Sequence, residues 1–324
     1  MLYVTGQQAR EAVSIEGILL VFRRVYKQCV QGAVQVGPRM VGDLDESGKK
    51  GQWLTAIDPE AGFFGSKFSA VFPDNPSRGK PATTSSISLY SMQTGDLVAI
   101  VEANALTATK TAASAAIATD LLARKNASCL VIIGSGLQAF DQVLAIKKVR
   151  DVSRVVVYDR DPERASKSVN SLKKTKDCAT VSFEVAESAN AAVAKADVLC
   201  TCTTSRKPVF DGSVLKKGTH INAIGSYAPD MQEIDCETVL RAHSIVTEHV
   251  DGLWAAAGDI LDPLERGLID RRKVCGSIGD LLSGTVPARV SESSITLYES
   301  VGSAVLDLAI AIEAYRKVSQ KANM

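Results

Sequence analysis

The chain has 324 residues, of which 46% are hydrophobic and 23% charged, and its formal net charge is +1. This length suggests about two domains, and the near-neutral charge gives no electrostatic case for nucleic acid or an anionic membrane as partner. No uncharged run approaches the roughly 18 residues needed to span a bilayer, and the first residues lack the pattern of a signal peptide. The seven cysteines show no metal-ligand spacing, so we expect free thiols, a cytoplasmic location and no metal site.

The first block, to about Thr111, predicts a mostly antiparallel sheet with helices. It opens with a helix whose apolar residues recur at helical spacing from Ile15 to Cys29. Five β-like runs follow, with turn signals such as residues 73–76 between them. They lie near residues 35–41, 52–57, 65–72, 85–91 and 97–102. This pattern is not that of a second nucleotide-binding fold.

The middle block alternates strands with helices. It begins at an alanine-rich helix over residues 112–124. Strands are expected at residues 129–133, 154–158, 181–185, 197–203, 220–225 and 244–247. Such alternation predicts an α/β fold with a doubly wound parallel sheet and right-handed crossovers.

A dinucleotide-binding fingerprint follows the first strand of this block. The strand runs into Gly134-x-Gly136-x-x-Ala139, and a helix is expected from about Gln138 to Val149. The first glycine permits the tight turn, the second lets backbone N–H groups approach a pyrophosphate, and the small third residue lets the helix pack on the strand. The next strand ends in Asp159, which is placed to bind the adenosine ribose hydroxyls.

The last block, from about Ser294, predicts a single helix. Its apolar stripe consists of Tyr298, Val301, Val305, Leu308, Ile312 and Tyr315. A lone terminal helix cannot fold by itself, so we expect it to pack on the first block. The sequence therefore predicts a Rossmann domain of residues 113–293 inserted in a discontinuous α+β domain of residues 1–112 and 294–324.

Three cations of the first block are candidates for substrate binding. A hydride acceptor that carries a carboxylate needs a fixed cation and a proton source. Arg39 follows a Gly-Pro pair at a strand edge, and Lys67 interrupts an apolar strand. Lys110 opens the alanine-rich helix, where the helix dipole opposes a cation unless it faces an anion. The alternative for both lysines is a solvent-exposed side chain.

A second group of candidates lies at the carboxyl ends of the later strands, where ligands of open parallel sheets bind. Thr201, Thr203 and Thr204 end one strand, and the loop 226–230 follows the next. The alternative for the threonines is ordinary β-propensity.

Together these residues resemble the ornithine cyclodeaminase/mu-crystallin family over nearly the whole chain. The match rests on Gly65-x-Lys67, Pro73-x-Asn75, residues 106–113, Gly134-x-Gly136-x-x-Ala139, residues 218–225, Pro229-x-x-x-Glu233 and Ser300-Val301-Gly302-x-Ala304. The resemblance implies that the discontinuous domain binds substrate and forms a homodimer. It implies that Arg39 and Lys110 hold a substrate carboxylate and that Lys67 is catalytic. The cofactor-binding candidates are Thr111, Gly134, Ser135, Gly136, Leu137, Gln138, Ala139, Asp159, Arg160, Thr201, Cys202, Thr203, Ser226, Val301 and Gly302.

Two positions depart from the family pattern. The family usually has arginine where this chain has Lys110, and lysine cannot form the bidentate fork with a carboxylate. Ornithine cyclodeaminases carry a catalytic aspartate where this chain has Tyr227. The loop 226–230 is closer to the reductase and mu-crystallin side of the family.

The expected activity is therefore NAD(P)H-dependent reduction of a small cyclic imino acid. Δ1-Pyrroline-2-carboxylate, giving proline, is the first substrate, and the piperideine homologue, giving pipecolate, is the second. Asp159 favours NAD(H), because it would repel a 2′-phosphate, while Arg160 and Arg164 leave NADP(H) possible. Three alternatives stay open: an ornithine cyclodeaminase, an alanine or opine-type dehydrogenase, and a non-catalytic ligand-binding protein like mu-crystallin.

Overall fold

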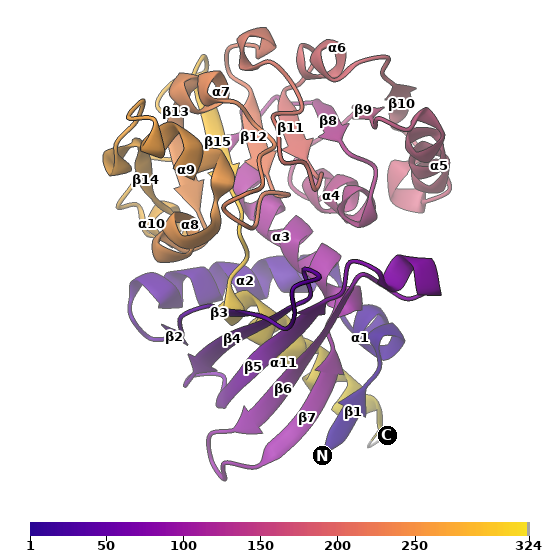
Figure 1. Cartoon of the computed structure of the whole chain (residues 1–324), viewed down its shortest axis with the longest axis vertical. Coiled ribbons are helices and arrows are strands. Elements are labelled where there is room, and N and C mark those ends of the chain that lie inside the picture. Colours follow the sequence, from indigo (N-terminus) through magenta and orange to yellow (C-terminus); the bar gives the residue numbers. More distant parts are fainter. Residues whose placement is uncertain (323–324) are drawn as a thin grey trace. The chain divides into compact units, whose positions relative to one another are not determined.

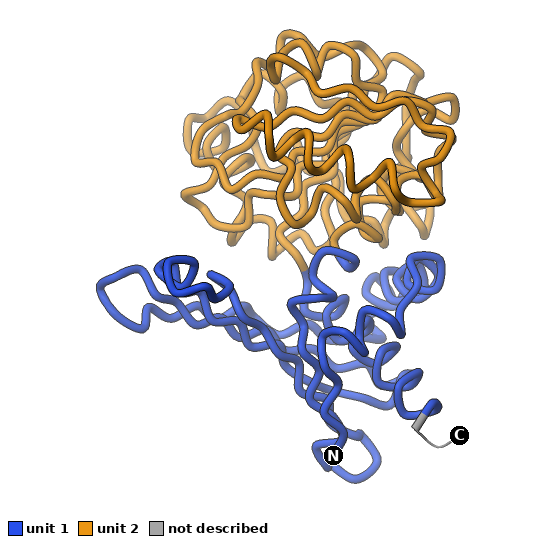
Figure 2. Tube along the Cα trace, turned by 90° about the vertical axis from the view of Figure 1, so that its right-hand side faces the viewer, with its two compact units in different colours: residues 1–110, 303–324 blue, residues 111–302 orange. Residues whose placement is uncertain are grey.

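The computed structural model describes residues 1–322, and the chain forms two compact units. Unit 1 comprises Met1–Lys110 and Ser303–Met324, and unit 2 comprises Thr111–Gly302. Figure 2 colours the two units separately. Each is described on its own below.

Unit 1 is built on a seven-stranded sheet of order β1-β7-β6-β5-β4-β2, with β3 also paired to β4. All neighbours are antiparallel except β1 and β7. The strands are β1 (Leu2–Val4), β2 (Gln35–Val36), β3 (Met40–Asp43), β4 (Lys50–Asp58), β5 (Phe63–Val71), β6 (Thr83–Ser91) and β7 (Leu97–Glu102). The mostly antiparallel sheet expected for the first block is confirmed.

The helices of unit 1 pack on one face of this sheet (Figures 1 and 2). They are α1 (Gly6–Ala12), α2 (Ile15–Val30) and α11 (Ala304–Ala322). Ser14 caps α2 by accepting a hydrogen bond from the backbone of Gly17, and the apolar stripe of α2 is buried. The C-terminal helix α11 contacts β4, β5 and β6 as well as α1 and α2. It packs on the first block, as predicted.

Two boundaries differ from the sequence-based expectation. Residues 295–299 are not helical but form strand β15 (Ile295–Glu299), which is buried along its whole length between β12 and β13. A buried run of five residues is too short for its periodicity to separate a strand from a helix. The alanine-rich helix α3 (Asn104–Leu122) starts eight residues before the expected Ala112, so Lys110 lies inside it and not at its dipole end.

Unit 2 contains an eight-stranded sheet of order β10-β9-β8-β11-β12-β15-β13-β14, and every pair in it is parallel (Figure 1). The remaining strands are β8 (Cys129–Ile133), β9 (Arg154–Tyr158), β10 (Ser182–Val185), β11 (Val198–Thr201), β12 (His220–Ala223), β13 (Ala242–Thr247) and β14 (Val274–Ser277). The helices are α4 (Leu137–Lys147), α5 (Pro162–Lys173), α6 (Ala189–Val193), α7 (Cys236–Arg241), α8 (Val250–Ala256), α9 (Gly258–Glu265) and α10 (Ile278–Ser283). The doubly wound α/β prediction is confirmed, with β14 and β15 as strands that it did not include.

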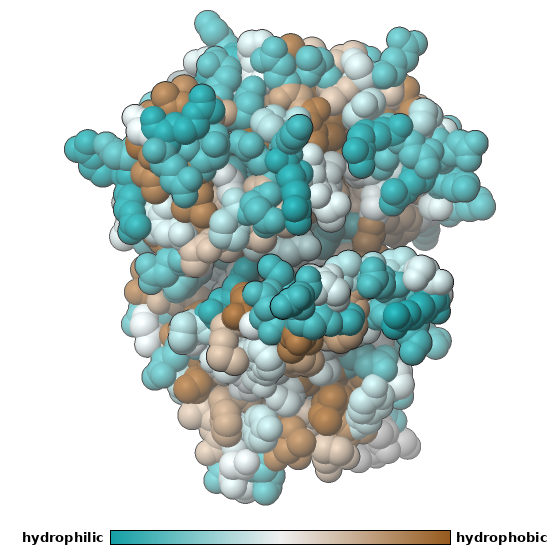
Figure 3. All heavy atoms as spheres, in the orientation of Figure 1, coloured by the Kyte–Doolittle hydropathy of each residue, from teal (hydrophilic) through white to brown (hydrophobic). Residues whose placement is uncertain are grey.

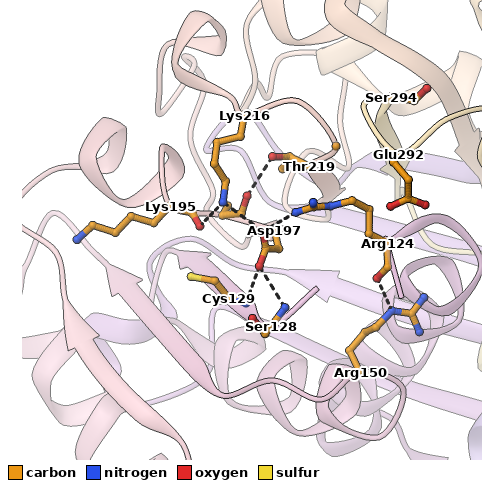
Figure 4. A network of polar contacts seen from close by, with 12 residues as sticks. Arg124, Ser128, Cys129, Arg150, Lys195, Asp197, Lys216, Thr219, Glu292 and Ser294 are labelled. Atoms are coloured by element: carbon orange, nitrogen blue, oxygen red, sulfur yellow. Dashed lines mark hydrogen bonds and ion pairs between the residues drawn. The ribbon is translucent and has the colours of Figure 1, made fainter. Parts of the chain in front are cut away.

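A half-buried carboxylate ties together the amino ends of β8 and β11. Asp197 Oδ2 accepts hydrogen bonds from the backbone N–H groups of Ser128 and Cys129 at 3.1 and 3.0 Å. Its Oδ1 accepts from Arg124 at 2.7 Å and from Lys216 at 3.1 Å (Figure 4). Burial opposes ionisation, but these donors keep the pKa of Asp197 below its usual value. This edge is therefore held by charge, and the opposite, carboxyl edge carries the cavity described next.

Candidate active site

A cavity of about 940 Å³ opens at the carboxyl ends of β8, β9, β11 and β12 in unit 2. Open parallel sheets bind ligands at this edge, because the loops that leave the strands there diverge and form a crevice. The lining residues are Ile133, Gly134, Gly136, Leu137, Gln138, Tyr158, Asp159, Arg160, Arg164, Cys202, Thr203, Thr204, Ser205, Arg206, Lys207, Pro208, Val209, Ile224, Gly225 and Tyr227. The volume and position suit a dinucleotide.

The turn between β8 and α4 lacks room for a larger first residue. Gly134 has φ of +92°, and a Cβ atom there would lie 2.8 Å from Cγ2 of Thr203 and 2.9 Å from the carbonyl oxygen of Cys202. Gly136 is the N-cap of α4, so backbone N–H groups of the first turn are available to an anion. Ala139 is buried in the core with Leu130 and Ile132. The tight turn at Gly134 and the packing of Ala139 agree with the fingerprint, and pyrophosphate binding at Gly136 stays a prediction.

Asp159 is oriented by hydrogen bonds from the glycine-rich turn between β8 and α4. Its Oδ2 accepts hydrogen bonds from both the backbone N–H and the hydroxyl of Ser135 at 2.7 Å, and its Oδ1 accepts from the N–H of Asp161 at 3.0 Å. Partial burial works against ionisation, but these bonds lower the pKa of Asp159. The Asp159 carboxylate is therefore an ionised hydrogen-bond acceptor in the cavity lining, and Arg160 and Arg164 line the same cavity.

Glu233 is a buried residue whose hydrogen bonds join two strand ends at the cavity. The sequence analysis gave it no role. Its Oε2 accepts from the Thr201 hydroxyl at 2.8 Å and from the Gly225 N–H at 2.7 Å, and its Oε1 accepts from the Thr203 N–H at 2.5 Å. Because Thr203 and Gly225 line the cavity, Glu233 fixes part of its wall. The motif Pro229-x-x-x-Glu233 was visible in the sequence, but its target groups were not.

Seven cofactor candidates lie outside the cavity lining as described for residues 1–322: Thr111, Ser135, Ala139, Thr201, Ser226, Val301 and Gly302. Two of them have structural hydrogen bonds instead. The buried Thr201 hydroxyl donates to Glu233, and the Ser226 hydroxyl donates to the carbonyl of Met231 at 2.9 Å. Val301 packs in the core of unit 2, and Gly302, with φ of +77°, ends that unit. Ser135 donates two hydrogen bonds to Asp159, which lines the cavity.

A second cluster lies in unit 1, where two lysines share one carboxylate. Lys67 on β5 and Lys110 on α3 both bind Oδ1 of Asp307 on α11, with N···O distances of 3.0 and 2.9 Å. The side chains of Lys67 and Lys110 are only 8% and 6% exposed. A buried charge is costly unless it is paired, which accounts for the common partner. The solvent-exposed alternative for both lysines is wrong.

Lys67 sits on the buried face of the unit 1 sheet, opposite Leu54 of β4 and Ile87 of β6. Burial lowers its pKa, Asp307 raises it, and the neighbouring charges of Lys110 and Arg39 lower it again, with a net lowering. The charge of Arg39 therefore affects Lys67, and its binding of a substrate carboxylate stays a prediction. Three cations and one carboxylate form a region suited to binding an anion and transferring a proton.

The ornithine cyclodeaminase/mu-crystallin family matches residues 10–322 of this chain. The chain belongs to this family. It is 34% identical over 257 residues to a Δ1-pyrroline-2-carboxylate reductase of Bacillus cereus, covering 79% of this chain and 78% of that protein.

Solved structures of family members superpose closely on the chain. The Δ1-pyrroline-2-carboxylate reductase of Thermococcus litoralis, in complex with NADH and L-proline, has a TM-score of 0.95 at 30% identity and covers 99% of this chain and 98% of its own. An archaeal alanine dehydrogenase dimer with bound NAD has a TM-score of 0.93 at 30% identity, with coverages of 99% and 97%. The fold and the family predicted from the motifs are confirmed.

The two residues that depart from the ornithine cyclodeaminase/mu-crystallin pattern lie in different units. Lys110 replaces the usual arginine and is one of the two lysines on Asp307. Tyr227 replaces the aspartate of the cyclodeaminases, and it lines the cavity with 43% of its surface exposed. Within residues 1–322, the helices are too short or too polar to cross a membrane.

Proposed function

We propose that the protein reduces Δ1-pyrroline-2-carboxylate to L-proline with NADH. The observation that carries this proposal is the buried pair Lys67 and Lys110, which adds an anion-binding and proton-donating cluster to a chain with a dinucleotide cavity. Relatives named for this reaction support it, and one of them was solved with NADH and L-proline. The piperideine homologue is the second substrate to test.

The residues of unit 1 would bind the substrate. Arg39 and Lys110 would hold its carboxylate, and Lys67 would orient the ring and supply the proton that its nitrogen needs. A lysine with a lowered pKa is suited to this task, because it releases its proton more readily near neutral pH. Holding the reactants together would supply much of the rate effect.

The residues of unit 2 fit a nicotinamide dinucleotide, which supplies the hydride when bound. The N–H groups beside Gly134 and Gly136 would hold the pyrophosphate, and Asp159 would bind the ribose hydroxyls. An ionised Asp159 disfavours a 2′-phosphate and so favours NAD(H). Arg160 and Arg164 would provide the charge for NADP(H) as a weaker cofactor.

Alanine dehydrogenase is the second candidate, because that enzyme from an archaeon shares the fold closely. An ornithine cyclodeaminase is disfavoured by Tyr227, because it stands where those enzymes carry their catalytic aspartate. A non-catalytic role like that of mu-crystallin would show tight cofactor binding without turnover.

One assay separates these functions. The protein is mixed with NADH or NADPH and a panel of cyclic imines, pyruvate with ammonia, or ornithine with NAD, and cofactor oxidation and ammonia are measured. We expect one NADH consumed per Δ1-pyrroline-2-carboxylate and no ammonia from ornithine. Faster turnover of pyruvate with ammonia would instead assign an alanine dehydrogenase, and ammonia from ornithine would assign a cyclodeaminase.

We also propose that unit 1 is the substrate-binding and dimerisation domain and unit 2 the dinucleotide-binding domain. The sheet face opposite the helices of unit 1 carries two partly exposed aromatic pairs, Trp53 with Phe68 and Phe64 with Tyr90, at centroid distances of 5.0 and 5.1 Å. Apolar side chains are visible among polar ones on this part of the surface in Figure 3. A second copy would cover them, as closed homodimers are the commonest oligomers. Sedimentation as a monomer at micromolar concentration would contradict the dimer.

The seven cysteines are free thiols, and this supports the proposal of a cytoplasmic location.

A further inference from the structure

One carboxylate in unit 1 binds both lysines of the proposed substrate site. Asp307 lies in the first turns of α11, and its side chain is 5% exposed. Its Oδ1 lies 3.0 Å from Nζ of Lys67 and 2.9 Å from Nζ of Lys110. These three side chains come from β5, α3 and α11, which are far apart in the sequence. Asp307 is not one of the residues that carried the family resemblance.

We infer that Asp307 is a positioning residue of the proposed reduction: it holds the two ammonium groups side by side and keeps Lys67 protonated for proton transfer to the substrate nitrogen. This inference rests on the proposed function for its kinetic consequences. The contacts themselves do not depend on it, so part of the test needs neither substrate nor cofactor.

The geometry requires such a counter-ion. Two nitrogens bonded to the same oxygen can be no farther apart than the sum of their distances to it, which is about 6 Å. Two ammonium groups this close repel each other, and burial strengthens the repulsion because little water screens them. Without Asp307, the two lysines would separate or one of them would lose its proton.

The charged groups that act on Lys67 come from three elements. Asp307 on α11 favours the charged amine, while Lys110 on α3 and Arg39 between β2 and β3 oppose it. Burial lowers the pKa of Lys67 further. Removing the charge of Asp307 leaves only groups that lower this pKa, so Lys67 would lose its proton at a lower pH.

In the proposed reduction, Lys67 supplies the one proton that the substrate nitrogen takes up. The imine carbon would gain the hydride that NADH supplies in the proposed function, with NADH oxidised to NAD⁺, and the electron pair of the C=N double bond would move to the nitrogen. The nitrogen takes a proton from Nζ of Lys67, which then recovers a proton from water. An unprotonated Lys67 cannot make this transfer, so its loss of a proton with rising pH forms the basic limb of the pH–rate profile.

The kinetic test compares Asp307→Asn with Asp307→Glu. We expect Asp307→Asn to lower kcat/KM for the imine by tenfold or more at pH 8 and to move the basic limb to lower pH by one unit or more. Asp307→Glu keeps the charge, so it should restore the position of the basic limb even where the longer side chain lowers kcat. A basic limb that stays in place in Asp307→Asn would overturn the inference.

A matched control is Asp58→Asn. Asp58 ends β4 in the same unit, is 1% exposed, and accepts a hydrogen bond from the Ala61 N–H at 2.9 Å. It tests whether removal of any buried carboxylate from unit 1 lowers activity through stability. Its pH profile should keep the wild-type limb.

The second readout is the titration of Lys67 by NMR of protein with ¹³C-labelled lysine. The Cε resonance is assigned by its absence in Lys67→Arg, and it is followed with pH without substrate or cofactor. Its midpoint should fall by one pH unit or more in Asp307→Asn, and an unchanged midpoint contradicts the inference. If the wild type reduces no imine, the proposed function fails, while this titration still decides whether Asp307 controls Lys67.

Discussion

Both units bury carboxylates close to a candidate site, but they surround them differently. In unit 1, Asp307 binds two ammonium groups, which outweigh burial and lower its pKa. In unit 2, burial raises the pKa of Glu233, and burial together with neighbouring carboxylates raises the pKa of Asp259 to about 8 and that of Glu299 well above its usual value. The partners of a buried carboxylate, more than its residue type, decide whether it is charged.

This difference separates two tasks. The cluster of unit 1 is charged and suits an anionic substrate. Burial raises the pKa of Glu233 and Asp259 in unit 2, and both act through hydrogen bonds: Glu233 holds the ends of β11 and β12, and Asp259 accepts from the N–H groups of Glu233 and Ile234 at 2.7 and 2.9 Å. Changes in unit 1 should therefore affect turnover, and changes in unit 2 should affect stability and cofactor binding.

The largest effect is expected from Lys67→Met. If Lys67 handles the proton on the substrate nitrogen, turnover should fall by roughly 10²-fold or more, a typical contribution of general acid–base catalysis. Cofactor binding, measured by NADH fluorescence, should hardly change, because the cavity is lined by residues of unit 2.

Lys50→Met is the control for this change. Lys50 begins the neighbouring strand β4, where its side chain is 49% exposed and 3.8 Å from Asp43. This variant should keep wild-type turnover. Near-normal activity of Lys67→Met would remove Lys67 from the proposed mechanism.

Glu233→Gln should have the next largest effect, and it acts on the cavity wall. Glu233 accepts three hydrogen bonds, but a glutamine has only one acceptor oxygen, so at least one donor of the set Thr201, Thr203 and Gly225 loses its partner. An unsatisfied buried donor costs about 1–3 kcal/mol. We expect that loss in the free energy of unfolding, measured in urea, together with weaker NADH binding. Unchanged NADH affinity would show that the brace does not shape the cofactor site.

The sequence predicted the unit 2 site better than the unit 1 site for a physical reason. Gly134, Gly136 and Asp159 belong to one β-α-β segment, where a tight turn and a following helix impose residue types at fixed spacing. The contact of Lys67 with Asp307 joins residues 240 positions apart, and no local pattern encodes it. The same limit applies to Glu233, whose motif was visible without its partners, and to β15, which was predicted as the start of a helix.

Asp159→Ser should change cofactor choice. Asp159 is at the cavity and ionised, so it resembles Asp307 in charge but binds neutral donors of Ser135 and Asp161. Serine removes the charge that would repel a 2′-phosphate. The ratio of kcat/KM for NADH over NADPH should fall by about tenfold, equivalent to about 1.4 kcal/mol. Asp177→Ser, which removes an exposed partner of Lys148, should leave the ratio unchanged. A wild-type preference of tenfold for NADPH would contradict the assignment of NAD(H).

Asp259→Asn should have the smallest effect on turnover and cofactor choice, and the pH dependence of its stability tests the contrast most directly. A carboxyl with a pKa of about 8 is mostly protonated at pH 7, and asparagine matches its shape and keeps an oxygen for the N–H groups of Glu233 and Ile234. Below about pH 3.9, where the unfolded wild type is protonated as well, stability should therefore change by less than about 0.5 kcal/mol, as for a substitution that breaks no contact. At pH 7 Asp259→Asn should be the more stable protein, because only the wild type must take up a proton at this position on folding. The sign of the pH effect follows from linkage. The folded state binds the proton more tightly than the unfolded state, whose pKa is near 3.9, so this group's stabilisation is complete below that pKa and is lost as pH rises through about 8. Between these values the wild type should lose up to about 1.4 kcal/mol per pH unit through Asp259, and Asp259→Asn should lack this slope in urea unfolding. Equal slopes in the two proteins would mean that Asp259 is already ionised in the folded state, and that unit 2 stabilises its buried carboxylates as charges, as unit 1 does.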